Sequence, residues 1–259
     1  MNKPAAIIDF DGTLTRVRCG WEDKMKEFFL SKIFTDKTTL SPELSQEARS
    51  MCDEWIAQAP GTTIVQQISA LANILDFCKI TYDFDRLIDE FDIYSSDWEY
   101  QRVNECKESG ELESLMLLGA RKFLEDLQAL GYELHLLSGT SHEKLIFECK
   151  TLGLSHFFKH IQGFETHLAM PYKPQSIRKT IADYKYEVKS TLIIGDGLTE
   201  LNAGRELKCP CIGVAIDEND GKSCDTHKLQ ILKDAGFEDI ISDFDNALQF
   251  IPLANPAQN

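Results

Sequence analysis

The stretch that decides the fold is IIDFDGTLT, residues 7–15, in which an apolar run meets Asp9 and Asp11 on either side of a phenylalanine and then Gly12. Side chains of a strand alternate between its faces, so the pattern predicts a strand over residues 5–10 that projects both carboxylates the same way. Gly12 has no Cβ and permits a turn close to a ligand. On its own, the stretch fits an ordinary strand ending in an Asp-Gly turn equally well.

Other short apolar runs along the chain have the length and composition of buried parallel strands. They cover residues 133–137, 191–194 and 211–216, with two shorter runs at 160–164 and 239–242. Helical patterns lie between them at residues 117–130 and 142–152, and each is followed by a glycine typical of a helix end. Strands that alternate with helices of this length predict an α/β fold built on a parallel sheet.

One interval breaks this alternation, because roughly a hundred residues follow the first strand, far more than an ordinary connection needs. Helical patterns cover residues 21–33 and a second segment that begins at Ser41-Pro42, an N-cap followed by a proline. A third pattern covers residues 64–75, after the Pro60-Gly61 break, and residues 85–106 hold one helix or two. We therefore expect an α/β core of residues 1–15 and 115–259, with residues 16–114 inserted as an all-helical domain.

The overall composition limits the classes of molecule that the protein is expected to bind. The 259 residues include 42 acidic and 27 basic side chains, for a net charge of −15. Such a surface repels nucleic acid and anionic membranes, so we expect neither as a partner. The eight cysteines form no disulfide framework, and no stretch resembles a secretory leader or a membrane span. These features predict a soluble protein of a reducing cytoplasm, and they say nothing about its oligomeric state.

Two further predicted strands end in residues that suit a phosphate site. The run 135–140 ends in Ser138-Gly139 just before a helix, where a hydroxyl and exposed backbone N–H groups can hold phosphate oxygens. Within residues 191–200, an apolar strand ends at Asp196, and Glu200 lies one helical turn later. Taken singly, Ser-Gly is common turn chemistry, and acidic residues at a helix start complement its dipole.

Lys173 lies in the sequence Pro171-Tyr172-Lys173-Pro174, which predicts a kinked loop before a helix. The flanking prolines restrict where the side chain can point, although most lysines are solvated surface charges. Gly195 and Gly197 begin a dinucleotide-binding pattern, but Glu200 stands where its third glycine belongs. A carboxylate at that place would repel a pyrophosphate, which excludes the nucleotide interpretation.

In chain order, DFDGT (residues 9–13), Ser138-Gly139, Lys173 and GDGLTE (residues 195–200) resemble the four motifs of the haloacid dehalogenase (HAD) superfamily of phosphatases. The similarity is greatest to its phosphoglycolate and phosphoserine phosphatase-like branches. It implies a Rossmann-like parallel sheet, with the helical insert as a C1-type cap. Glu200 departs from the pattern, since many members have aspartate there.

The resemblance implies a role for each motif residue. Asp9 would attack phosphorus and become an aspartyl-phosphate, while Asp11 would protonate the leaving oxygen and then activate water. Mg²⁺, which prefers hard oxygen ligands, would be held by Asp9, the backbone carbonyl of Asp11 and Asp196, with Glu200 acting through a water molecule on the metal. These four residues would form the metal and reaction centre.

Lys173 would offset the charge of the nucleophile and the phosphate, and Ser138 with the Gly139 N–H would hold the transferred oxygens. The resulting hypothesis is a Mg²⁺-dependent phosphatase that hydrolyses a small phosphorylated metabolite. A phosphomutase acting on a sugar phosphate shares all four motifs and stays open. A non-catalytic binding or regulatory protein on the same fold is a second alternative, although it would have no chemical need for the complete set of motif residues.

Three pairs of residues lie outside the motifs but have side chains that can bind ligands. Arg16 and Arg18 directly follow the nucleophile strand, and either is a candidate ligand for an anionic group on the substrate, against the simpler reading of solvated charges. His156 and His160 are spaced to share a helix face, but no third metal ligand lies near them in sequence, which favours a surface role. The cysteines at 209 and 211 are expected to pack at the edge of the core.

Overall fold

The computed structural model describes residues 3–35, 38–56, 64–164 and 172–252. The predicted break at Pro60-Gly61 and the proline at position 171 lie outside them. The described chain divides into two compact units, Met1–Cys19 with Val103–Asn259, and Gly20–Arg102. We call these the sheet unit and the helical unit.

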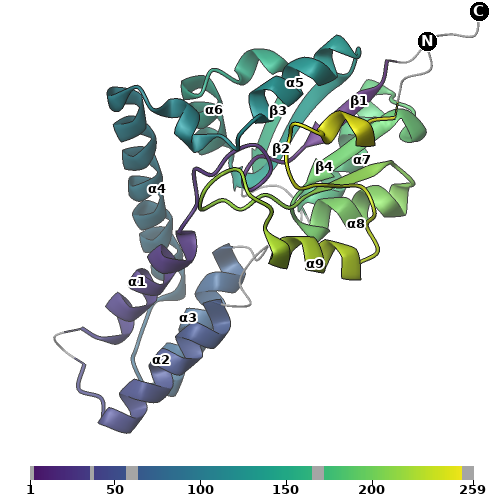
Figure 1. Ribbon diagram of the computed structural model, residues 1–259. Coiled ribbons are helices and arrows are strands. Elements are labelled where there is room, and N and C mark those ends of the chain that lie inside the picture. Colours follow the sequence, from purple (N-terminus) through teal and green to yellow (C-terminus); the bar gives the residue numbers. More distant parts are fainter. Residues whose placement is uncertain (1–2, 36–37, 57–63, 165–171, 253–259) are drawn as a thin grey trace, which may run out of the picture. The chain divides into compact units, whose positions relative to one another are not determined.

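The sheet unit contains a 6-stranded sheet in the order β3-β2-β1-β4-β5-β6, and every neighbouring pair is parallel (Figure 1). The strands are β1 (Ala5–Ile8), β2 (Glu133–Ser141), β3 (Phe158–Phe164), β4 (Thr191–Gly195), β5 (Cys211–Val214) and β6 (Ile240–Ile241). The predicted α/β fold with a parallel sheet is confirmed. Because the order runs outward from β1 in both directions, the sheet changes winding direction between β1 and β4, where such sheets bind ligands.

Helices cover both faces of this sheet. They are α5 (Ala120–Ala129), α6 (His142–Thr151), α7 (Tyr172–Tyr184), α8 (Leu198–Leu207) and α9 (Thr226–Asp234), with short 3₁₀ turns at Leu112–Leu115, Ser155–Phe157, Val188–Ser190 and Ala247–Phe250. Along β1, Ala6 and Ile8 share a buried cluster with Phe123 of α5, whereas Ile7 packs in a cluster with Ile177 of α7. Burial on both faces explains why this strand is apolar throughout rather than alternating.

The first strand is shorter than predicted, since β1 ends at Ile8 and not at Phe10. Gly12 adopts a positive φ of 68°. Its N–H donates to the Thr15 carbonyl at 2.8 Å, and the Thr15 N–H donates to the Phe10 carbonyl at 3.0 Å. The chain therefore turns tightly from Phe10 onward, so strand alternation does not set the direction of Asp11.

The helical unit holds α1 (Trp21–Ile33), α2 (Pro42–Ile56), α3 (Ile64–Phe77) and most of α4 (Phe84–Ser109). Their apolar faces form a separate buried cluster around Phe29, Leu71 and Leu75. One continuous helix replaces the possible pair expected after residue 84, because that segment contains no glycine or proline to break it. The division between the units falls inside α4, so residues 103–114 and 16–19, expected in the helical domain, group with the sheet.

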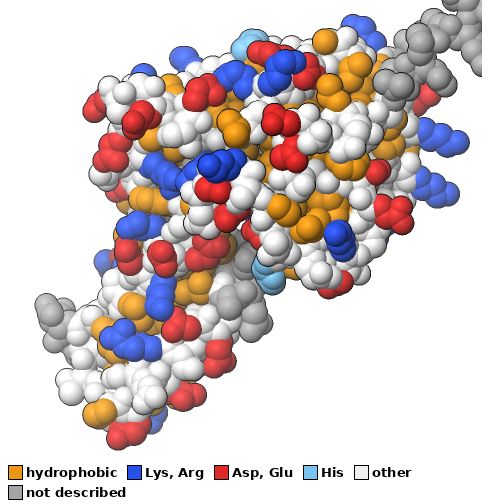
Figure 2. All heavy atoms as spheres, in the orientation of Figure 1, with side chains coloured by type: hydrophobic (Ala, Val, Ile, Leu, Met, Phe, Trp, Pro, Cys, Tyr) orange, Lys and Arg blue, Asp and Glu red, His pale blue; other side chains and the backbone are white. Residues whose placement is uncertain are grey.

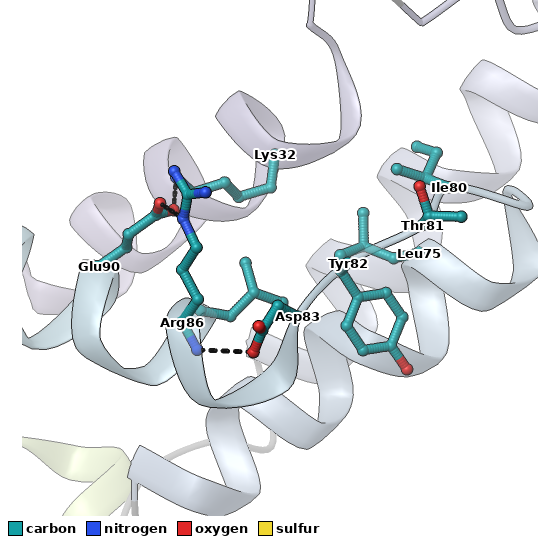
Figure 3. Close-up of a pocket in the computed structure, with 9 residues that line it drawn as sticks. Lys32, Leu75, Ile80, Thr81, Tyr82, Asp83, Arg86 and Glu90 are labelled. Atoms are coloured by element: carbon teal, nitrogen blue, oxygen red, sulfur yellow. Dashed lines mark hydrogen bonds and ion pairs between the residues drawn. The ribbon is translucent and has the colours of Figure 1, made fainter.

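A shallow hollow of about 500 Å³ lies on the helical unit near the turn between α3 and α4 (Figure 3). Its charged residues pair with one another: Lys32 and Arg86 both donate to the Glu90 carboxylate, at 2.6 and 2.7 Å. Tyr82 lies apart from these three residues, on the far side of Asp83 in this view (Figure 3). None of the motif residues lines this hollow, so it does not help to locate the chemistry.

The two histidines whose spacing would allow a shared helix face do not share one. His156 lies in the 3₁₀ turn Ser155–Phe157, whereas His160 lies in β3. The 3₁₀ helix ends after 3 residues, because the chain becomes extended at Phe158. The pair therefore has no common helical surface, and both residues are exposed, which agrees with the expected surface role. Cys209 is buried in the cluster under β4, and Cys211 begins β5 at its edge.

Candidate active site

The carboxyl ends of β1 and β4 bring Asp9 and Asp196 together. Ile8 pairs with Ile194 across the two strands, and the Asp9 N–H donates to the Ile194 carbonyl at 2.9 Å. Asp9 is thus the first residue beyond β1, and Asp196 is the first beyond β4. The site lies at the point where the sheet changes winding direction, the position expected for ligand binding in this architecture.

Lys173 forms a buried bridge between two carboxylates. Its Nζ donates to Asp9 Oδ2 at 2.8 Å and to Glu200 Oε2 at 3.0 Å, and the Asp9 side chain is only 7% exposed. Lys173 lies in the first turn of α7 rather than in the predicted loop, because that helix begins at Tyr172. The fixed φ of Pro174 is compatible with a first helical turn, so the prolines did not exclude a helix there.

Burial and charge act in opposite directions on this pair. Burial, reinforced by the Glu200 and Asp196 carboxylates, raises the pKa of Asp9 to about 8 despite the opposing effect of Lys173. Burial alone would lower the pKa of Lys173, but the carboxylates of Asp9 and Glu200 outweigh it and raise that pKa above its usual range. Burial thus opposes the ionised form of Asp9, whereas the charge of Lys173 favours it.

Glu200 has a structural task besides its contact with Lys173. Its Oε1 accepts a hydrogen bond from the Gly197 N–H at 2.8 Å and so caps the start of α8. A Cβ on Gly195 would overlap the Glu200 carboxylate, and one on Gly197 would lie 2.9 Å from Oε1. Both glycines of the GDG sequence are thus explained by the space that the Glu200 side chain fills.

Asp196 is held from two sides. The Thr13 hydroxyl accepts from the Asp196 N–H at 3.0 Å and donates to Oδ1 at 3.3 Å. On the other side, Lys228 of α9 donates to Asp196 Oδ2 at 2.8 Å and to Glu218 Oε1 at 2.7 Å. A Cβ on Gly12 would overlap Asp196 Oδ2, so this turn needs a glycine for close approach as well as for its positive φ.

Lys228 and Glu218 form a second bridge that resembles the one made by Lys173. The carboxylates of Asp196 and Glu218 raise the pKa of Lys228 above its usual range, although burial opposes them. Burial raises the pKa of Glu218, an effect that Lys228 opposes. Both side chains are about one-fifth exposed, at 21% and 22%, so these charges border the site rather than lying in its interior.

Asp11 has different partners from Asp9. The Thr140 hydroxyl donates to Asp11 Oδ2 at 2.8 Å, and Arg18 Nη1 donates to Oδ1 at 2.5 Å. Arg18 also binds Glu148 of α6, through contacts of 2.8 and 3.1 Å. Glu148 is only 2% exposed, so Arg18 joins a buried carboxylate to the predicted acid and base.

The second motif lies at a bulge in β2, where the pairing with β3 shifts between Leu137 and Ser141. Ser138 is buried, and its hydroxyl accepts from the Thr140 N–H at 3.1 Å. A Cβ on exposed Gly139 would lie 4.0 Å from Lys173 Cε. The bulge therefore brings Ser138-Gly139 beside Lys173, and bulges of this kind often re-aim groups near active sites.

Arg16 points to a different neighbour from Arg18. Its Nη2 donates to the Asn219 carbonyl, and its Nε is buried without a hydrogen-bond partner in the described chain. Arg16 thus joins the chain after β1 to the loop after β5. Both arginines engage protein groups, and neither contact by itself tests a role in binding a substrate anion.

Three of these carboxylates meet the requirements of a cation site. One oxygen each of Asp9, Asp196 and Glu200 lies within 4.8 Å of the others. All three offer hard oxygen donors, the ligand type that Mg²⁺ prefers. The donor set therefore fits a divalent cation such as Mg²⁺.

Sequence reasoning missed Thr13, Thr140, Lys228 and Glu218 as site residues. The two threonines stand inside or next to predicted motifs, so a hydroxyl at a strand tip was an available signal. Lys228 lies 32 residues after Asp196 in an ordinary helical pattern. Only the path of the loop after β5 brings it back to the site, and no residue spacing reports that path.

Comparison with known proteins agrees with this geometry. A family model for haloacid dehalogenase-like hydrolases matches residues 3–208, whereas no curated protein matches the chain. Similar solved structures include a haloacid dehalogenase-like family hydrolase from Streptococcus pneumoniae (15% identity, 97% of this chain and 99% of that chain, TM-score 0.63). A predicted phosphoglycolate phosphatase from Haemophilus somnus is also similar (14% identity, 97% and 99%, TM-score 0.61).

A third solved structure, of a Thermotoga maritima protein named as a candidate β-phosphoglucomutase, has 14% identity over 94% of this chain and 96% of that chain, with a TM-score of 0.57. At these identities the structural likeness establishes the fold alone. The family model covers most of the chain and all four motifs. The chain therefore belongs to the haloacid dehalogenase-like hydrolases.

Proposed function

We propose that this protein is a Mg²⁺-dependent phosphatase that hydrolyses a small phosphorylated metabolite through an aspartyl-phosphate on Asp9. The observation that carries the proposal is the buried Asp9 beside Lys173, with Asp196 and Glu200 completing a set of hard donors. A carboxylate cannot readily approach a phosphate dianion unless cations offset the charge. Lys173 supplies one such cation, and the donor set supports a second.

The protein residues would divide the work as follows. Asp9 attacks phosphorus, and Lys173 keeps the nucleophile and the phosphoryl oxygens close together. The Ser138 hydroxyl and the Gly139 N–H bind those oxygens. Mg²⁺ held by Asp9, the Asp11 carbonyl and Asp196, with Glu200 outside them, would neutralise phosphate charge during transfer.

Asp11 would give a proton to the leaving oxygen and then take one from the water that hydrolyses the phosphorylated aspartate. Its contacts to Thr140 and Arg18 are consistent with a side chain held at a defined position. We further propose that the helical unit acts as the cap and selects the leaving group, because it is inserted directly after β1.

The charge of the protein bears on which classes of molecule it can bind. Figure 2 shows acidic and basic side chains interspersed over the face in view, and the net charge of −15 opposes binding to nucleic acid. Among the described residues, no helix has the length and apolar character that crossing a bilayer requires. We propose a small phosphorylated molecule as the substrate class, because the chain belongs to the haloacid dehalogenase-like hydrolases and solved structures similar to it include a predicted phosphoglycolate phosphatase.

The test is release of inorganic phosphate from a metabolite panel that includes phosphoglycolate, phosphoserine, sugar phosphates and nucleoside monophosphates, with and without Mg²⁺. The proposal predicts Mg²⁺-dependent phosphate release that Asp9→Asn abolishes and Asp11→Asn slows severely. Isomerisation of a sugar phosphate in place of phosphate release would identify the phosphomutase alternative. Full activity of Asp9→Asn would refute the mechanism.

A further inference from the structure

Lys228 occupies an unusual place for a lysine. The Asp225 carboxylate caps α9 by accepting from the N–H groups of His227 and Lys228, which puts Lys228 in the first turn of that helix. The N-terminal turn carries the positive end of the helix dipole, where a cationic side chain is unfavourable. Carboxylates must offset this placement, and Asp196 and Glu218 do so at 2.8 and 2.7 Å.

The loop that carries Glu218 is fixed by contacts of its own. The Asp217 N–H donates to the Ser223 carbonyl at 2.8 Å, and the Asp220 carboxylate accepts from the backbone N–H of Ser223 at 2.9 Å. Arg16 holds the same loop through the Asn219 carbonyl. Glu218 is therefore held near Lys228 by a loop with its own hydrogen bonds. The contact is not an incidental one between two flexible surface side chains.

Asp196 is the proposed metal ligand most directly affected. One of its oxygens faces Thr13 and the other faces Lys228. Whichever oxygen binds a metal ion, the ammonium group of Lys228 remains within a few ångströms of that ion. Two cations at such a separation repel strongly even at a high effective dielectric constant, whereas Glu218 on the far side of Lys228 partly cancels the repulsion.

We propose that Lys228, which contacts Asp196 and is balanced by Glu218, sets through its charge how tightly the site binds a divalent cation. This inference rests on the proposed metal site, but not on the identity of the substrate. Lys228 lowers the affinity because its charge opposes that of the metal. Glu218 raises the affinity because it neutralises Lys228. The two residues therefore have opposite effects, which a purely structural role for the pair does not produce.

The experiment measures Mn²⁺ binding to chelator-treated full-length protein by electron paramagnetic resonance of the free ion. Lys228→Met should bind Mn²⁺ about tenfold more tightly than the wild type, and Glu218→Gln several-fold more weakly. Lys233→Met and Glu238→Gln remove the same charges at exposed positions of the same region, and they should leave the dissociation constant within about twofold. Circular dichroism confirms that each variant is folded.

Unchanged or weaker binding by Lys228→Met, with the wild type binding Mn²⁺, would overturn this inference and leave the proposed function standing. Equal losses in Lys228→Met and Glu218→Gln would also overturn it, since they would indicate a structural role. Binding by neither the wild type nor Lys228→Met would refute the metal site itself. Binding that appears only in Lys228→Met would support the inference in its strongest form.

Discussion

Replacing Arg18 with methionine should destabilise the sheet unit strongly, because it breaks a contact between buried charges. Arg18 binds Glu148 through two nitrogens and binds Asp11 through one of them. The side chains of Arg18 and Glu148 are 14% and 2% exposed. Methionine keeps much of the length of the arginine stem while removing the charge, so the loss reports mainly on electrostatics and hydrogen bonding.

Removing one partner of a buried ion pair costs about 3 kcal/mol or more. For a unit of this size each kcal/mol lowers the melting temperature by roughly 2–4 °C, so we expect a fall of about 6–12 °C in scanning calorimetry. Arg178→Met is the matched control. It removes an arginine from the Arg178–Glu206 pair, whose side chains are 49% and 67% exposed, and should cost about 1 kcal/mol at most.

A second substitution tests how much of the lost stability comes from leaving the Glu148 carboxylate buried without Arg18. Adding Glu148→Met to Arg18→Met removes the carboxylate that the first change left without its arginine. The double variant should therefore recover at least about 1 kcal/mol relative to Arg18→Met. A double variant no more stable than Arg18→Met, or a single variant that melts within about 2 °C of the wild type, would refute this account of Arg18.

Three further predictions concern stability. Burial lowers the pKa of His135 to about 4, so the folded chain stays neutral there while the unfolded chain takes up a proton near pH 6.5. Stability should be complete above that pH and fall by up to ~3 kcal/mol as the pH drops toward 4, a slope that calorimetry should find flattened in His135→Gln. Glu200→Ala should be about 1 kcal/mol less stable than Glu200→Gln, whose amide oxygen can still accept from the Gly197 N–H, and equal melting temperatures would contradict the capping role. Gly195→Ala should cost roughly 1–3 kcal/mol in urea unfolding, since its Cβ would displace the Glu200 carboxylate; a neutral effect would show that this space is not needed.

The sequence predicted the sheet well because buried parallel strands are short continuous apolar runs. β1, β2, β4 and β5 all lie within one to four residues of their predicted ends. It also indicated where motif residues lie, since Asp9 and Asp196 directly follow β1 and β4, whereas Ser138 ends an apolar run but lies at a bulge inside β2. The helical insert was recognisable from apolar periodicity and from the N-cap and proline at Ser41-Pro42.

The partners of those residues were harder to foresee. Arg18 and Glu148 are separated by 130 positions, and nothing in the local pattern of α6 distinguishes Glu148 from a solvated helix residue. Lys228 reaches Asp196 only because of the loop after β5. Strand alternation, from which the direction of Asp11 was predicted, does not apply to that residue, because β1 ends at Ile8 and the chain turns at Gly12. Contacts of this kind depend on how loops fold back, which periodicity and spacing do not encode.

The central claim is that Asp9 carries the phosphoryl group. After a substrate is found in the metabolite panel, brief reaction with Mg²⁺, acid quench and borohydride reduction would convert a phosphorylated aspartate into homoserine, which peptide mass spectrometry locates. The account predicts homoserine at position 9 in the wild type and none in Asp9→Asn. Homoserine at Asp11 or Asp196 instead, or rapid turnover with no trapped aspartate under conditions that reduce a control acyl phosphate, would contradict it.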